Sequence, residues 1–232
     1  EILYTAGNVL AADAWPEFED FTITSNRMWG ISRNVPSNVY YSKLFEDNIA
    51  PEFNVSLIIP LGRNRTCTAI GSLDDKVIVF TKDEVFAIYG TGPDNTGANG
   101  DFIVDKLQSR YGCTDPNSLV EYENGLCWYS SISGEFHAID QNLQVTDIGG
   151  AVQDFSEQII QVYGAVVYPA ENEIRWVCTF NSPLEFGGTR VNDLGPARPK
   201  FTQPPVGSCL VYNYEQNKWG QIDGQFGNYV TL

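Results

Sequence analysis

The chain has 232 residues, of which 43% are hydrophobic, so it is long enough and apolar enough to bury a substantial core. Its 29 acidic residues against 14 Lys and Arg give a net charge of −15. This balance argues against a nucleic-acid reader, which needs a basic surface to displace counterions from phosphates. No apolar run approaches the roughly 20 residues that cross a bilayer, so we expect no membrane span.

The residue types favour an all-β protein with many short strands. Thirteen Phe, twelve Tyr and five Trp stand against a single Met, and aromatic side chains suit a pleated, half-buried surface. The 21 Gly and 12 Pro are spread along the chain, as expected for short elements that are joined by turns.

The first predicted hairpin has strands over 21–24 and 28–31 around a polar turn at 25–27. A further strand is expected at 38–42. The second hairpin pairs 68–73 with 77–80 around Asp74-Asp75-Lys76, and more strands are expected at 84–89 and 102–104. Between those last two strands, the oxygen-rich stretch 92–101 resembles a calcium loop in composition. It lacks the ligand order of an EF-hand, so we interpret it as a glycine-rich connection.

The third hairpin pairs 119–122 with 126–129, and the fourth pairs 165–168 with 174–177. Strands are expected after the third at 135–139 and 143–146. After the fourth they are expected at 209–214 and 218–222. A short helix is predicted from Asp154 to Tyr163. A long inserted loop over 181–207 contains five Pro, a length that is typical of functional or disordered segments.

The four hairpin turns recur at a constant spacing. Their centres lie near residues 26, 75, 124 and 172, so the intervals are 49, 49 and 48 residues. Such a period matches one blade of a β-propeller. A β-sandwich also has short strands, but it has no reason to repeat at this period. We therefore predict a β-propeller domain or fragment over 1–232, with about four visible four-stranded blades. Both ends of the chain read as mid-strand, so we expect it to be part of a larger propeller.

The residues show no catalytic constellation, and we predict no enzyme activity, no cofactor and no metal site. His137, the single histidine, is expected at the surface or half-buried in a strand. The adjacent Asp74 and Asp75 lie in a turn, where Asp favours the backbone geometry. Five Cys without a CxxC motif are expected to be buried free thiols.

Several segments resemble the propeller part of the tail nozzle proteins, also called tail tubular protein B, of short-tailed bacteriophages. The likeness covers most of residues 1–223. The segments that carry it, in chain order, are 26–29 with 38–43, then 72–80 with 88–93, and then 112–113, 117–118, 125–126 and 147–150. Nozzle proteins are much longer chains, so the residues that line their channel cannot be transferred to this sequence.

The resemblance implies a structural protein of the virion, made in the bacterial host cytoplasm and located in the phage tail. It implies a ring of six copies that seals packaged DNA and then lets it pass, without sequence-specific binding. It also implies contacts with neighbouring adaptor and fibre proteins. We expect these assembly contacts in the 181–207 loop, at Phe186, Arg190, Arg198 and Phe201.

A second hypothesis is a non-catalytic propeller that binds glycan or protein at a cell surface. It needs an aromatic and polar pocket on one face, to which Trp15, Trp219 and Tyr229 would contribute. A propeller hydrolase is the third hypothesis, and it lacks paired acids in a suitable setting.

Overall fold

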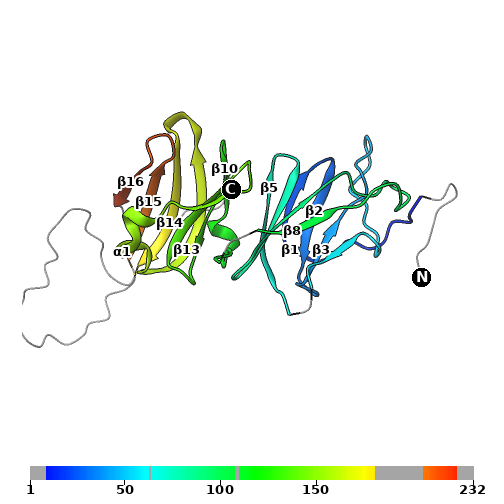
Figure 1. Cartoon of the computed structure of the whole chain (residues 1–232), viewed down its shortest axis with the longest axis horizontal. Helices are drawn as coiled ribbons and strands as arrows, with labels where there is room; N and C mark the ends of the chain where they lie inside the picture. The colour runs from blue at the N-terminus through cyan, green and yellow to red at the C-terminus, as the bar shows by residue number, and fades with distance from the viewer. Residues whose placement is uncertain (1–8, 63, 108–109, 181–205, 224–232) are drawn as a thin grey trace, which may run out of the picture.

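A computed structural model describes residues 9–62, 64–107, 110–180 and 206–223. Within them the protein consists mainly of strands that form four antiparallel sheets (Figure 1). Each sheet has four strands in chain order, because each strand pairs with the next one along the chain. The predicted all-β architecture of four four-stranded blades is confirmed.

The sheets take their strands from consecutive stretches of the chain. The first sheet contains β1 (Phe18–Thr24), β2 (Arg27–Ser32), β3 (Asn38–Tyr41) and β4 (Ile58–Pro60). The second contains β5 (Cys67–Leu73), β6 (Lys76–Thr81), β7 (Val85–Tyr89) and β8 (Ile103–Lys106). The third contains β9 (Val120–Tyr122), β10 (Gly125–Ser130), β11 (Glu135–Asp140) and β12 (Val145–Asp147). The fourth contains β13 (Ile159–Tyr168), β14 (Glu173–Phe180), β15 (Val206–Asn213) and β16 (Lys218–Asp223).

The four repeated turns are the connections between the first and second strands of the four sheets. Asn26, Asp74 and Asn172 adopt left-handed backbone conformations there, with φ of 57°, 54° and 55°. Asn and Asp tolerate this region better than other residues with a side chain, which explains why they recur at the turns.

The first strands of successive sheets contact one another, β1 with β5, β5 with β9 and β9 with β13. This is the arrangement of the inner strands of propeller blades, which converge toward a common axis. Figure 1 shows the first and second sheets in one half of the molecule and the third and fourth sheets in the other.

Three apolar clusters fill the three junctions between successive sheets. The first joins Trp29 of the first sheet to Val79 of the second. The second cluster contains Phe80 and Trp128, and the third contains Phe136 and Trp176. These side chains have an exposed fraction of 1% or less, so each blade buries its faces against its neighbours.

Two sequence predictions differ from the structure. The helix expected over 154–163 is only the single turn α1 (Gln153–Ser156), and β13 begins at Ile159. That stretch is rich in β-branched and aromatic residues, which favour pairing along β14. The inserted loop expected to end at residue 207 ends earlier, because β15 already begins at Val206. The remainder of that loop, 181–205, lies outside the described residues.

Candidate functional site

The inner edge of the blades carries negative charge only. We define this inner edge as the four first strands with the turns that follow them, residues 18–26, 67–75, 120–124 and 159–172. It contains no Lys, Arg or His, and its carboxylates are Glu19, Asp20, Asp74, Asp75, Glu121, Glu123 and Glu171. A surface of this kind repels polyanions within a Debye length of about 10 Å.

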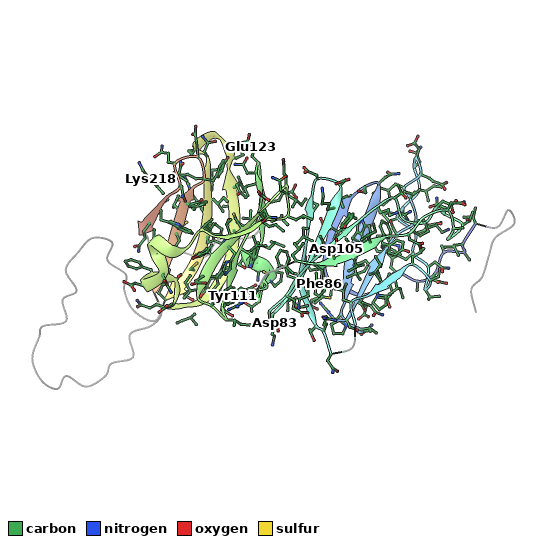
Figure 2. The ribbon with its side chains drawn as sticks, in the orientation of Figure 1. Asp83, Phe86, Asp105, Tyr111, Glu123 and Lys218 are labelled. Carbon is green, nitrogen blue, oxygen red and sulfur yellow. The ribbon has the colours of Figure 1, made fainter. Side chains whose placement is uncertain are left out.

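Four of these acids sit in the turns and give one end of the blades an acidic rim. Glu123 lies at the opposite end of the strands from Asp83 and Tyr111 (Figure 2). Lys76, the first residue of β6, directly follows one of these turns, and its Nζ lies 2.9 Å from Asp75 Oδ1. Their hydrogen bond lowers the pKa of Asp75, so this carboxylate stays ionised at neutral pH.

Asp20 also links the first sheet to the second through a hydrogen bond. Its Oδ2 accepts a hydrogen bond from the backbone N–H of Ile70 at 3.0 Å, and its Oδ1 accepts one from the N–H of Phe21 at 2.9 Å. Burial raises the pKa of Asp20, and the two hydrogen bonds oppose that rise. Its role is therefore structural as well as electrostatic.

A groove of about 640 Å³ opens at the rim, between the turns of the second, third and fourth sheets. Tyr122 and Tyr214 lie side by side in it, with ring centroids 5.2 Å apart. The carboxylates of Asp74, Glu121 and Glu123 also line it. The groove thus combines two tilted aromatic rings with acidic residues, and it joins residues that are far apart in sequence.

His137 is buried, with an exposed fraction of 3%, so the prediction of a surface or half-buried position is wrong. It pairs across the strands with Trp128, which directs its ring into the protein, where it stacks on Tyr111 at 5.2 Å. Its Nε2 lies 3.2 Å from Ser133 Oγ. Burial lowers the pKa of His137, so the ring is neutral at neutral pH.

The cysteines and the 92–101 loop, which the sequence also offered as candidate sites, are held by packing and by hydrogen bonds within the protein. All five Cys are free and buried, as predicted, and burial raises the pKa of the Cys113 thiol to about 12. In the 92–101 loop, Asp94 accepts hydrogen bonds from the Thr96 backbone N–H and from Asn99 Nδ2 at 2.8 and 2.7 Å. A hydrogen bond from the Thr96 hydroxyl, together with those from Asn99 Nδ2 and the Thr96 N–H, lowers the pKa of Asp94 to about 2. No group of three or more potential metal ligands occurs within the part of the chain that the structure describes.

The predicted assembly contacts Phe186, Arg190, Arg198 and Phe201 all lie outside the described residues, as does Tyr229. The other two aromatic residues considered for a surface pocket do not come together. Trp219 packs against Trp176 at 5.6 Å and donates a hydrogen bond to the Ile148 carbonyl, whereas Trp15 lies beside Phe53. Sequence reasoning missed Tyr122 and Tyr214, because only the fold brings these turns together.

Across the described segments, no helix is both long and apolar enough to span a membrane.

No protein-family model matches this chain, and no curated protein matches it. Among solved structures, it is similar to cobalt-substituted Synechocystis ACO, with 8% identity and a TM-score of 0.40 over 88% of this chain. A mutant of Synechocystis apocarotenoid oxygenase matches with 7% identity and a TM-score of 0.37 over 88% of this chain. The chain spans about half the length of these structures, 47% of each. At such scores the likeness assigns neither activity nor cofactor to this protein.

Proposed function

We propose that this protein is a structural component of a bacteriophage virion, a tail nozzle ring protein that forms part of the DNA-ejection conduit. In this proposal, six copies form the ring, the ring holds adaptor or fibre proteins, and the chain has no enzymatic role. The resemblance of its blade segments to tail nozzle proteins suggests the family. The observation that carries the proposal is the inner edge, with seven carboxylates and no basic residue.

DNA that passes through a conduit must slide along its wall without binding to it. A basic wall would bind phosphates and release counterions, and that binding would have to be broken at every step. Carboxylates on the inner edge instead keep the duplex away from the wall by repulsion over about 10 Å. A channel lined in this way allows transit without specific contacts.

Charge reversal on the rim tests this argument. The variant carries four substitutions, Asp74→Lys, Asp75→Lys, Glu123→Lys and Glu171→Lys. We expect no duplex binding by the wild-type chain. The variant should bind DNA at low salt, with an affinity that falls with log salt at a slope of about −0.9 per phosphate contact. Fluorescence anisotropy with a short labelled duplex measures both. Tight binding by the wild-type chain would contradict the proposal.

The location of the chain is tested on purified phage particles, by electron microscopy after labelling with antibodies raised against this protein. Label at the distal end of the tail is the expected result. Particles that contain no copy of the chain would overturn the proposal.

The groove at the rim favours one second candidate, a non-catalytic propeller that binds glycan at a cell surface. Tyr122 and Tyr214 supply apolar faces, and Glu121, Glu123 and Gln141 supply polar groups beside them. A glycan-binding screen with wild-type chain and Tyr214→Ala tests it. A hit that the substitution abolishes would favour this candidate, and no hit would remove it.

A further inference from the structure

The rim groove, of about 640 Å³, has walls that come from three sheets. The second sheet supplies Asp74, the third supplies Glu121 and Glu123, and the fourth supplies Val167 and Tyr214. These residues are far apart in sequence, so the groove exists only when the three blades are stacked. A ligand in this groove contacts three blades at once.

The charge on the rim groove is uniformly negative. Its lining residues include the acids Asp74, Glu121 and Glu123, and none of them is Lys, Arg or His. Within the described residues, none of these three carboxylates has an ion-pair partner, whereas the neighbouring Asp75 is paired with Lys76. Carboxylates that share one groove without a cation favour a positively charged ligand.

Hydrogen bonds between the turns hold the walls of the groove in place. Ser72 Oγ of the second sheet donates to Glu121 Oε2 at 2.7 Å, which fixes that carboxylate across the second junction. In the fourth sheet, the backbone N–H of Tyr214 donates to the Asn172 carbonyl at 2.9 Å, and Asn172 Nδ2 donates to Glu215 Oε2 at 2.8 Å. A site that is ordered before its ligand arrives loses less conformational entropy on binding.

Two tyrosines give the groove an aromatic component. The rings of Tyr122 and Tyr214 come from different sheets, with centroids 5.2 Å apart and planes tilted by 55°. Both are half-buried and pack on the third junction. Burial raises the pKa of Tyr214, and the charges of Glu123 and Glu215 add to this rise. The ring therefore lies in a negative potential, which strengthens the attraction of a cation to an aromatic face.

The chain itself shows how a guanidinium is held by such a combination of groups. The guanidinium of Arg175 lies 3.9 Å from the Tyr168 ring centroid, and its Nη2 lies 2.7 Å from Glu173 Oε2. Arg65 is held in the same way by an aromatic ring and a carboxylate. The rim groove has the rings and the carboxylates, and none of its lining residues supplies the cation.

We propose that the rim groove binds an arginine-bearing segment of a partner protein. The guanidinium lies against the rings of Tyr122 and Tyr214 and donates hydrogen bonds to the carboxylates of Glu121 and Glu123. Arginine suits this site because its planar group stacks on aromatic rings and donates to carboxylates in a fork. The inference rests on the proposed function in one respect, since it names the kind of segment by which a neighbouring adaptor or fibre protein attaches at the mouth of the conduit.

Two other occupants fit the groove less well. A neutral glycan has hydroxyls that both donate and accept, but among the lining side chains only Gln141 and the tyrosine hydroxyls can donate. A polyamine carries the right charge. Its ammonium groups do not stack on rings as a guanidinium does, and its flexible chain loses more conformational entropy on binding.

Fluorescence anisotropy with two labelled peptides tests the proposal on the purified chain. One peptide is Ala-Arg-Ala-Arg-Ala, and the other has citrulline at both arginines, which keeps the shape and removes the charge. The groove variant combines Glu121→Gln with Glu123→Gln, which keeps the acceptor oxygens. The matched control combines Glu17→Gln with Glu157→Gln and has the same net charge. Glu17 and Glu157 are exposed and precede β1 and β13, at the end of the first strands away from the rim.

We expect the wild type and the control to bind the arginine peptide with equal affinity, and the citrulline peptide about tenfold or more weakly. The groove variant should bind the arginine peptide about tenfold more weakly, because two charge-assisted hydrogen bonds become neutral ones. Tyr214→Leu should weaken binding about twofold to fivefold through loss of the cation–π contact. Tyr214→Phe keeps the ring and should bind as the wild type does. Circular dichroism verifies that each variant is folded.

No binding by the wild type would overturn the proposal. Equal binding by the groove variant and the control would do the same, because the peptide would then follow only the net charge of the chain. Equal binding of the citrulline peptide would also overturn it. Spermidine or a glycan that displaces the labelled peptide at a lower concentration than unlabelled arginine peptide would assign the groove to that ligand instead.

These measurements use the purified chain only, so they are separate from the labelling of phage particles. Failure of the peptide to bind leaves that labelling to decide the proposed function. Absence of label from phage particles leaves the groove as a site for a basic segment of another protein.

Discussion

β5 and β13, the first strands of the second and fourth sheets, occupy the same place in the repeat but differ in burial. β5 is almost entirely buried, whereas half of β13 is exposed. In β5 every residue is buried except the half-buried Thr68 and Ser72, because a sheet packs on each side. In β13 only Val162 is buried and half of the ten residues are exposed, with Tyr163 56% exposed. Apolar sequence alone therefore does not decide burial in a blade. The presence of a neighbour on each side does.

Truncation of large aromatic residues should give the largest difference in stability between a buried junction position and an exposed position of the same sheet. Trp176→Ala should cost about 3–5 kcal/mol of unfolding free energy, because it empties a fully buried position. It also removes the hydrogen bond from Trp176 Nε1 to the Ser118 carbonyl. Tyr163→Ala, on the open face of the same sheet, should change stability by less than about 0.5 kcal/mol. Urea unfolding of both variants measures this, and equal losses would contradict the account of the junctions.

Valine substitutions at two glycines of the first strands should change stability in opposite directions. A Cβ at Gly71 of β5 would lie 3.1 Å from Leu126 Cδ1, so Gly71→Val should overpack the second junction and cost about 1–3 kcal/mol. A Cβ at Gly164 of β13 would meet nothing within 4 Å. Gly164→Val should be neutral or stabilise by up to about 1 kcal/mol, since Val favours strands. Thermal melts of the two variants are the measurement, and a clear loss at Gly164 would show that this face is covered.

Asp20 tests whether the hydrogen bond or the charge holds the first junction. Asp20→Ala leaves the buried N–H of Ile70 without its acceptor and should cost about 1–3 kcal/mol. Asp20→Asn keeps an acceptor oxygen and should be tolerated. Because burial raises the pKa of Asp20 in the folded chain, its contribution to stability increases as pH falls through that pKa. Unfolding curves from pH 3 to 7 measure this, and the stability of the wild type relative to Asp20→Asn should increase as the pH falls through the pKa of Asp20.

The smallest change in stability is expected from substitution of Asp94, because this residue lies in a loop and not in a junction between sheets. Its pKa is lowered to about 2, so its ionised form favours the folded chain above the ordinary pKa of 3.8. That contribution is lost as pH falls through about 2. Wild type should melt slightly higher than Asp94→Asn at pH 5, and the difference should vanish near pH 2. A difference that persists at pH 2 would assign the effect to geometry and not to charge.

The repeat and the four blades could be predicted from the sequence because turns have local chemistry. Asn26, Asp74 and Asn172 mark left-handed positions between apolar runs, and their spacing fixes the blade length. The start of β13 was missed, because an apolar stretch after a capping residue fits helix and strand alike until β14 supplies a pairing partner.

The site was less predictable than the fold. Phe21 and Val166 have the same apolar character as buried strand residues, so no local signal reveals that they are exposed. The rim groove depends on turns from three sheets, and His137 owes its burial to Trp128 across the strand. The acidity of the inner edge is visible in the sequence once the first strand of each blade is known.

The most direct test of the central claim, a channel wall made from the inner edge, is electron cryomicroscopy of the assembly that the full chain forms. The account predicts a ring in which β1, β5, β9 and β13 face an open central channel, with the acidic rim at its mouth. A chain that stays a single copy, or a particle with these strands turned away from the centre, would contradict it.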